Sequence, residues 1–207
     1  MRDKLRFSAS VLCLLATAIL LTIYLAWLFY PLEISYFALP EKVHLKVETI
    51  QYNFNILMNY LTNPFSQKLA MPNFRSSVAG LHHFQAVKYL FHLAQVVFVL
   101  TLPALIFFIQ KVIKKRFLAL YQRNLLILSL LPFIMICLAG LIGFNSFFTL
   151  FHQMLFVGDN TWLFDPAKDP VIWILPEEFF MHAFILFALL YEGIFLSLYF
   201  FSRKTRS

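Results

Sequence analysis

Histidine is the residue type in this sequence that is best suited to acid–base chemistry. Of the six histidines, His83 lies just before one long apolar run and His152 just after another. The two are therefore expected at the same height in the fold, although about 70 residues separate them in the chain. Because histidine titrates near neutral pH, two imidazoles in one pocket can serve as a base and an acid. The alternative is that both are amphipathic residues that fill an interface.

Other catalytic signatures are missing from the sequence. It has no serine elbow, no His-Glu-x-x-His motif and no glycine-rich phosphate loop. Cys13 and Cys137 both lie inside apolar runs, where a thiolate is disfavoured and a disulfide framework is not expected. No cofactor and no metal site are expected.

The polar stretch that begins at Asp159 is rich in residues that form turns or bind ligands. Asp159, Asp165 and Asp169 lack the alternating spacing and the terminal glutamate of a calcium loop, which argues against a metal. A structural role, with Asp and Pro in turns and Trp162 anchored at an interface, is at least as good an interpretation as catalysis. Asn160 could contact a substrate, because its amide both donates and accepts hydrogen bonds.

The composition indicates where these residues are located. Hydrophobic residues make up 61% of the 207 residues, aromatic residues 18% and charged residues 13%, whereas a soluble domain is about half apolar and a quarter charged. A soluble protein of this size could not bury so much apolar surface. The composition excludes a cytosolic enzyme, a disordered tail and a nucleic-acid-binding module, and it predicts a membrane protein.

Four apolar segments are long enough to cross a bilayer, which takes roughly 20 residues. Because only a helix satisfies its backbone hydrogen bonds within one segment, each is predicted to be an α-helix. The helices are expected at about 7–32, 86–110, 125–144 and 179–201. The apolar stretch of the first is longer than that of a signal peptide, so it is expected to be a retained anchor.

The basic residues are unevenly distributed between the connections. Three segments carry 11 of them with Asp3 as the sole acid: the N-terminus, the connection 111–123 and the C-terminus, which includes Arg206. The other connections carry six basic and eight acidic residues. The positive-inside rule therefore places both termini in the cytoplasm and the loops 33–85 and 145–178 outside. The net charge of +7 is a topology signal.

The outer loops are expected to form a small helical cap. Apolar residues recur at spacings of three and four between Val47 and Leu61, which predicts an amphipathic helix. The predicted fold is thus an all-α membrane protein with four transmembrane helices and an extracellular cap, in one domain over residues 1–207.

Two stretches carry a more specific pattern. The first runs from Asn53 to Phe65 and continues to His83-Phe84; the second includes Phe151-His152, Gly158-Asp159-Asn160 and Phe164-Asp165-Pro166. With the four-helix layout, they resemble the bacterial lipoprotein intramolecular transacylases over effectively the whole chain. Many members of that family have an acid before the first histidine, an Asp three residues after it and a Tyr in the first stretch. This chain has Gly80, Ala86 and Phe54 there.

The resemblance implies a reaction. Such enzymes move an acyl chain from the glycerol sn-2 oxygen of a diacylated bacterial lipoprotein to the α-amino group of its N-terminal cysteine, which gives a lyso-form lipoprotein. It also implies that His83 and His152 are the catalytic histidines, at the outer face of the bacterial cell membrane. As a hypothesis, His83 begins as the base and His152 returns the proton.

The chemistry needs only groups that the sequence supplies. Donor ester and acceptor amine belong to one substrate molecule, so no enzyme nucleophile is required. The α-ammonium, with a pKa of about 8, must lose a proton, and the departing alkoxide must gain one. Asn160 or Tyr60 could stabilise the oxyanion. The expected substrate-binding residues are Tyr60, Phe84, Phe148, Phe156, Asn160, Trp162 and Asp165.

One residue favours a different class of protein. Glu192 is expected near the bilayer midplane, where an acid is costly and often functional. A hydrogen bond to Thr101 would make it structural. The alternative function is therefore a non-catalytic membrane transport or partner-binding protein, and a third possibility is a lipid ester hydrolase.

Overall fold

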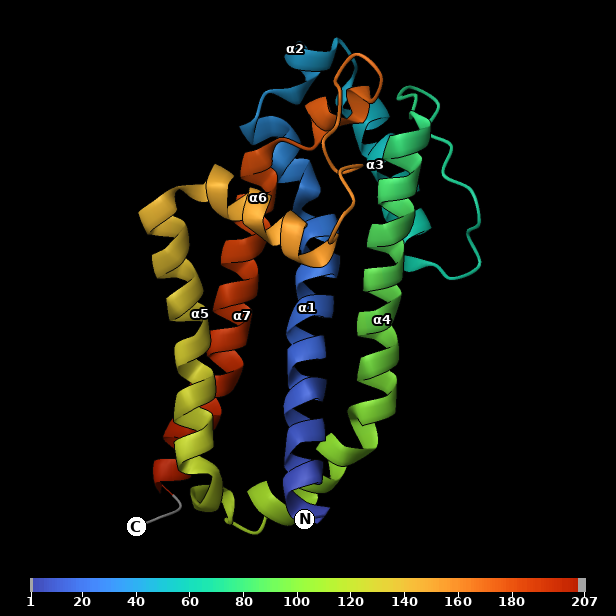
Figure 1. Cartoon of the computed structure of the whole chain (residues 1–207). Coiled ribbons are helices and arrows are strands. Elements are labelled where there is room, and N and C mark those ends of the chain that lie inside the picture. Colours follow the sequence, from blue (N-terminus) through green and yellow to red (C-terminus); the bar gives the residue numbers. More distant parts are fainter. Residues whose placement is uncertain (1, 205–207) are drawn as a thin grey trace. The chain divides into compact units, whose positions relative to one another are not determined.

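The computed structural model describes residues 2–204, so Arg206 lies outside the described residues. Helices are the only regular elements within that range (Figure 1). The long helices are α1 (Arg2–Tyr36), α4 (Val78–Phe108), α5 (Gln122–Ile142) and α7 (Glu177–Lys204). The shorter ones are α2 (Leu39–Val43), α3 (Val47–Thr62), α6 (Phe144–Leu155), the π-helix η1 (Ile109–Ile113) and the 3-10 helices η2 (Leu118–Tyr121) and η3 (Pro170–Ile174).

Four helices among the described residues are long and apolar enough to cross a membrane, as predicted. All four start before the apolar segment from which they were predicted: α1 begins at Arg2, α4 at Val78, α5 at Gln122 and α7 at Glu177. Apolar runs mark the hydrocarbon layer, whereas a helix continues into polar sequence for as long as its ends are satisfied. The early start of α4 places His83 inside the helix rather than before it.

The chain forms two compact units. Unit 1 comprises Met1–Thr22, Ala94–Phe144 and Phe184–Ser207, and unit 2 comprises Ile23–Leu93 and Asn145–Ala183. Helices α1, α4 and α7 contribute residues to both units. A single domain over residues 1–207 stays a prediction.

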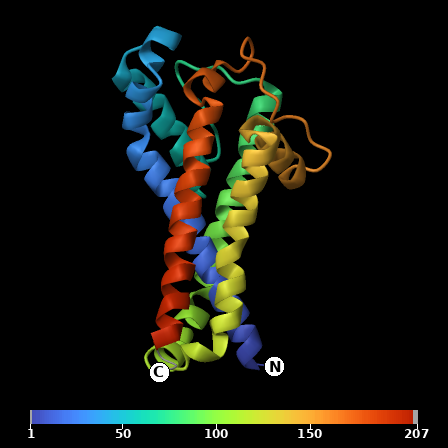
Figure 2. The same ribbon diagram turned by 90° about the vertical axis from the view of Figure 1, so that its left-hand side faces the viewer.

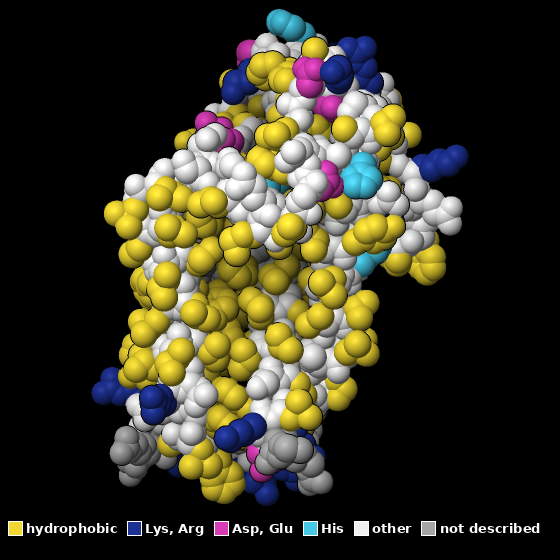
Figure 3. All heavy atoms as spheres, in the orientation of Figure 1, with side chains coloured by type: hydrophobic (Ala, Val, Ile, Leu, Met, Phe, Trp, Pro, Cys, Tyr) yellow, Lys and Arg dark blue, Asp and Glu magenta, His cyan; other side chains and the backbone are white. Residues whose placement is uncertain are grey.

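Unit 1 consists of four helical segments, from α1, α4, α5 and α7, that run alongside one another (Figures 1 and 2). Its core is formed by Ala18, Phe108, Leu118, Leu125, Tyr191 and Phe195. The Tyr191 hydroxyl donates to the Leu128 carbonyl (3.1 Å), which joins α7 to α5. Figure 3 shows hydrophobic side chains over the unit's visible face and Lys and Arg gathered where α1 begins and α7 ends.

The suggested hydrogen bond between Glu192 and Thr101 in unit 1 is absent. The Thr101 hydroxyl donates to the Val97 carbonyl of its own helix (2.6 Å). Both carboxylate oxygens of Glu192 are buried and have no hydrogen-bond partner among residues 2–204. A hydroxyl that can bond back to its own helix does not need a partner across the bilayer core.

Unit 2 contains the predicted amphipathic helix as α3, with Ile50, Phe54 and Leu57 buried. Phe54 stacks on Tyr30 of α1, with ring centroids 3.4 Å apart, and Phe179 of α7 meets both rings edge-on. The Tyr30 hydroxyl donates to the Ile174 carbonyl (2.7 Å). We refer to Tyr30, Phe54 and Phe179 as the Tyr30 cluster; it fixes α1, α3 and α7 within this unit.

Candidate active site

His83 and His152 lie next to each other in unit 2. His83 projects from α4 and His152 from α6, and their ring centroids are 5.9 Å apart with 36° between the planes. Only 5% of His83 is exposed, whereas His152 is partly buried. The structure therefore brings together the two imidazoles that the sequence placed at a common height.

Aromatic rings surround both imidazoles. Phe156 lies against both, at 4.9 Å from His83 and 5.8 Å from His152. Phe164 meets His83 edge-on at 5.5 Å, and Phe84 contacts Phe164 at 5.3 Å. This wall limits the access of water to the His83 ring.

The ring of His152 has two further aromatic neighbours. Phe148, one turn earlier on α6, lies 4.2 Å away, and Trp162 stacks on the imidazole at 4.9 Å with 29° between the planes. We refer to His83, His152, Phe148, Phe156, Phe164 and Trp162 as the histidine cluster.

One hydrogen bond fixes the tautomer of His152. Its Nδ1 lies 2.8 Å from the Phe148 carbonyl oxygen. Because a carbonyl can only accept, Nδ1 carries the hydrogen, and in the neutral ring Nε2 has the free lone pair. Burial lowers the pKa of His152 from its ordinary value, and the hydrogen bond to Phe148 partly opposes that change. A neutral His152 is thus prepared to accept a proton at Nε2.

Two polar atoms of the histidine cluster are buried without a partner among the described residues. They are Nδ1 of His83 and Nε1 of Trp162. A buried polar group without a hydrogen bond costs about 1–3 kcal/mol, so folded proteins leave few of them. Two in one cluster indicate a site that receives a ligand.

Asp169 holds the start of the helix that carries His83. Ser77 precedes α4 and donates twice to the Asp169 carboxylate, from its backbone N–H and its hydroxyl, both at 2.7 Å. The hydroxyl also accepts from the N–H of Gly80 (3.0 Å), as an N-cap does. Asp169 is only 3% exposed, so this cap is a buried link between the loop 156–176 and α4.

Gly80 has no room for a side chain. A Cβ atom there would collide with the Asp169 carboxylate and would lie 3.0 Å from the Phe164 ring. Many members of the resembled family have an acid at this place before the first histidine. In this chain the close approach of Asp169 and Phe164 explains the glycine.

Asp159 is the acid whose charge acts on His83 of the histidine cluster. The chain turns at Gly158, where φ is +77°, and the Asp159 carboxylate accepts the Thr161 N–H at 2.8 Å. Its other oxygen lies 3.3 Å from Nδ1 of the exposed His82. The hydrogen bonds from Thr161 lower the pKa of Asp159, so the carboxylate stays ionised at neutral pH.

Three of the expected substrate-binding residues have other surroundings. Tyr60 packs against the buried Lys88, whose ammonium lies 4.5 Å from the ring centroid. Asn160 is exposed on its loop. Asp165 is exposed, accepts the Ala167 N–H at 3.0 Å and lies 3.3 Å from the Lys168 ammonium, so its contacts stabilise a local turn.

Three residues of the site were not predicted from the sequence: Phe164, Asp159 and Asp169. All three belong to the same polar–aromatic stretch as Trp162, which was the available signal. Their roles depend on the path of a loop, and a loop has no periodicity from which its side-chain directions could be read. Within residues 2–204, no group of three His, Cys, Asp or Glu residues could hold a metal ion.

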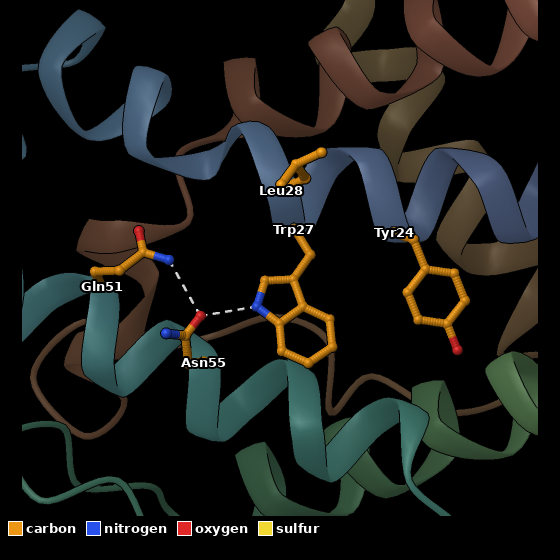
Figure 4. A pocket seen from close by; sticks show the side chains of 5 residues that line it. All are labelled: Tyr24, Trp27, Leu28, Gln51 and Asn55. Atoms are coloured by element: carbon orange, nitrogen blue, oxygen red, sulfur yellow. Dashed lines mark hydrogen bonds between the residues drawn. The ribbon is translucent and has the colours of Figure 1, made fainter.

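A hollow of about 330 Å³ between α1 and α3 is lined by other residues (Figure 4). Trp27 and Gln51 both donate to Asn55 Oδ1, at 2.8 and 3.1 Å. Tyr24 and Leu28 complete the lining. Its lining contains no histidine and no carboxylate, so this hollow lacks the side chains that exchange protons most readily near neutral pH.

Comparison with known proteins identifies the family. The model of the family described as "Lipoprotein intramolecular transacylase Lit" matches residues 5–180. The chain belongs to this family. It is therefore an acyltransferase, and the predicted family, fold class and enzyme class are confirmed. The non-catalytic alternative is not supported.

Solved structures of one family member are similar to this chain. The membrane-integral lipoprotein intramolecular transacylase from Bacillus cereus matches with 29% identity and a TM-score of 0.84, over 96% of this chain and 91% of its own. Two forms of it in which one histidine is replaced, by alanine or by arginine, match with 28% and 26% identity and TM-scores of 0.77 and 0.71. They cover 99% of this chain and 94% and 93% of their own. No curated protein sequence matches.

Proposed function

We propose that the protein moves the sn-2 acyl chain of a diacylated bacterial lipoprotein to the α-amino group of its N-terminal cysteine, with His83 and His152 carrying the protons. The observation that supports this most directly is the contact of two imidazoles, 5.9 Å apart, inside an aromatic enclosure of a transacylase-family chain. The reaction needs an acid, a base and a fixed substrate geometry, and it needs no enzyme nucleophile.

The hydrogen bond of His152 favours it as the initial base, the reverse of the hypothesis formed from sequence. The amine nitrogen, after releasing one ammonium proton to solvent, attacks the sn-2 carbonyl carbon and gives a second proton to Nε2 of His152. The carbon–oxygen ester bond then breaks. His83 donates a proton to the glyceryl oxygen and regains one from His152 on its other nitrogen. Both rings finish neutral: the proton lost by nitrogen ends on His83, and the proton that His83 held ends on the new hydroxyl.

The neighbouring residues would orient the substrate. The ionised Asp159 carboxylate, held by Thr161 and only weakly paired with His82, can bind the α-ammonium before it is deprotonated. Phe148 and Phe156 would restrict the glyceryl group and exclude competing water. Fixing the two reacting groups in this way can contribute about 7–11 kcal/mol of the barrier in favourable cases.

The membrane orientation follows the distribution of charge. The start of α1, the segment from η1 to the start of α5 and the end of α7 lie at one end of unit 1 (Figure 1). They carry ten of the eleven basic residues that the charge distribution assigned to one side, all but Arg206. The positive-inside rule favours the cytoplasmic side of the bacterial cell membrane for this end of unit 1. The same rule, applied to the charges of the loops 33–85 and 145–178, favours the outer face for these loops, which carry His83 and His152.

Mass spectrometry of a lipoprotein tests the proposal. Cells with the gene should show an amide-linked chain on the N-terminal cysteine and a monoacylated glyceryl group; cells without it should show neither. His83→Ala and His152→Ala should each lower turnover at least 100-fold. His44→Ala removes an exposed histidine outside the cluster and should leave turnover unchanged.

The outcomes separate the reaction from the residue roles. A cysteine that stays free of amide-linked acyl in cells with the active gene would rule out the proposed function. Wild-type turnover by either alanine variant would instead remove that histidine from the mechanism and leave the reaction in place.

A further inference from the structure

The indole nitrogen of Trp162 is a hydrogen-bond donor that the fold leaves unused. Nε1 is buried and has no acceptor among residues 2–204. Water would normally satisfy such a donor, and leaving it unpaired is unfavourable. Another tryptophan of unit 2 shows the usual solution, because Trp27 Nε1 donates to Asn55 at 2.8 Å.

The position of the unused donor is chemically significant. Trp162 stacks on His152 with ring centroids 4.9 Å apart, so the rim of the indole lies within a few ångströms of the imidazole that we propose as the base. The attacking nitrogen must contact that base, and the carbonyl carbon must lie about 3–3.5 Å from the nitrogen. The carbonyl oxygen is consequently within reach of the indole edge.

The donors expected from the sequence are less suitable. Tyr60 packs against the Lys88 ammonium at 4.5 Å, and burial raises the pKa of its hydroxyl. Asn160 is exposed on its loop, where its amide is open to solvent. Neither is a buried donor in the histidine cluster.

We infer that the N–H of Trp162 stabilises the oxyanion of the tetrahedral intermediate, a role that rests on the proposed acyl transfer. When the nitrogen adds to the ester carbonyl, the electron pair of the carbon–oxygen double bond moves to the oxygen. That oxygen then accepts the indole N–H. No proton is transferred from Trp162, and the oxyanion collapses when the bond to the glyceryl oxygen breaks. A neutral donor in a dry enclosure costs no reorganisation at that moment.

The decisive experiment removes the N–H and keeps the ring. Trp162→Phe and Trp162 replaced by benzothienylalanine, which has sulfur in place of N–H, are assayed as purified full-length enzyme with a diacylated lipopeptide. We expect kcat to fall about 100- to 1,000-fold in both, with KM changed less than about threefold. Trp27→Phe removes an indole N–H outside the histidine cluster and should retain wild-type kcat.

A second measurement separates an electronic role from a structural one. A phosphonate lipid that mimics the tetrahedral intermediate should bind Trp162→Phe more weakly by about the same factor as kcat falls. An uncleavable ether analogue of the substrate should bind both enzymes equally. A structural defect would weaken both ligands, and that result would overturn the role.

Turnover by Trp162→Phe or the benzothienyl form within about threefold of wild type would also overturn it. A wild-type enzyme that forms no amide-linked product would overturn the proposed function together with this role. Wild-type product formation with full activity of the Trp162 variants would overturn this role alone.

Discussion

Unit 2 contains two aromatic clusters that differ in the hydrogen bonding of their buried polar atoms. In the Tyr30 cluster the polar atom is satisfied, because the Tyr30 hydroxyl donates to Ile174. In the histidine cluster, Nδ1 of His83 and Nε1 of Trp162 have no partner among the described residues. The rings of the Tyr30 cluster are all buried, whereas those of the histidine cluster other than His83 are partly buried. Unpaired polar atoms mark the cluster that is built for a ligand, and satisfied ones mark the cluster that is built for stability.

Phe54→Ala should test the stability side of this contrast with the largest effect. It removes the ring that stacks on Tyr30 and should lower the free energy of unfolding by about 3–5 kcal/mol. Thermal unfolding in detergent would measure the loss. Turnover per folded molecule should stay near wild type, since Phe54 belongs to the other cluster. A specific activity that falls in proportion to stability would mean that the two clusters are not separate in function.

Asp169→Ala should affect both properties, because Asp169 joins the loop of the histidine cluster to the start of α4. It leaves two Ser77 donors unpaired and should cost about 3 kcal/mol of stability. Displacement of His83 should also lower kcat about tenfold with KM little changed.

Asp169→Asn is the control for position, because it keeps an acceptor for the Ser77 N–H. It should recover most of the lost kcat. If Asn and Ala behave alike, the charge of Asp169 matters and the position of α4 does not explain the effect.

The protonation state of His152 offers a subtler test. Because burial lowers its pKa below the ordinary 6.5, the ring should stay neutral as the pH falls through 6.5 and protonate only below it. Folding stability should accordingly be full above pH 6.5 and fall as the pH drops toward the lower pKa of the folded state. NMR of ¹⁵N-labelled histidine should show the Nδ1–H tautomer, and His152→Gln assigns the signal. A midpoint above 6.5, or the Nε2–H tautomer, would contradict the proposed base.

Asp165→Asn should have the smallest effect. The substitution removes an exposed charge next to Lys168 and keeps the oxygen that accepts the Ala167 N–H. Both stability and kcat should therefore stay close to wild type, within about 0.5 kcal/mol and twofold. A tenfold rise in KM for the lipopeptide would restore Asp165 to the substrate site.

The parts of the molecule that follow a period were predictable from the sequence. The four long helices and α3 were found from apolar length and spacing, although α4 starts at Val78, earlier than its apolar run. The meeting of His83 and His152 was predictable because both flank such runs. The choice among Asp159, Asp165 and Asp169 was not, because it depends on turns such as the one at Gly158. Tyr60 was expected to bind substrate, and the sequence did not reveal that its ring packs on Lys88.

The collision that a Cβ atom at Gly80 would make has a consequence for natural variation in this chain. Positions 80 and 169 belong to segments far apart in the sequence, yet they compete for one volume beside the Phe164 ring. Neither can enlarge alone. A larger residue at position 80 would therefore require a smaller one at position 169, and we expect the two positions to change together.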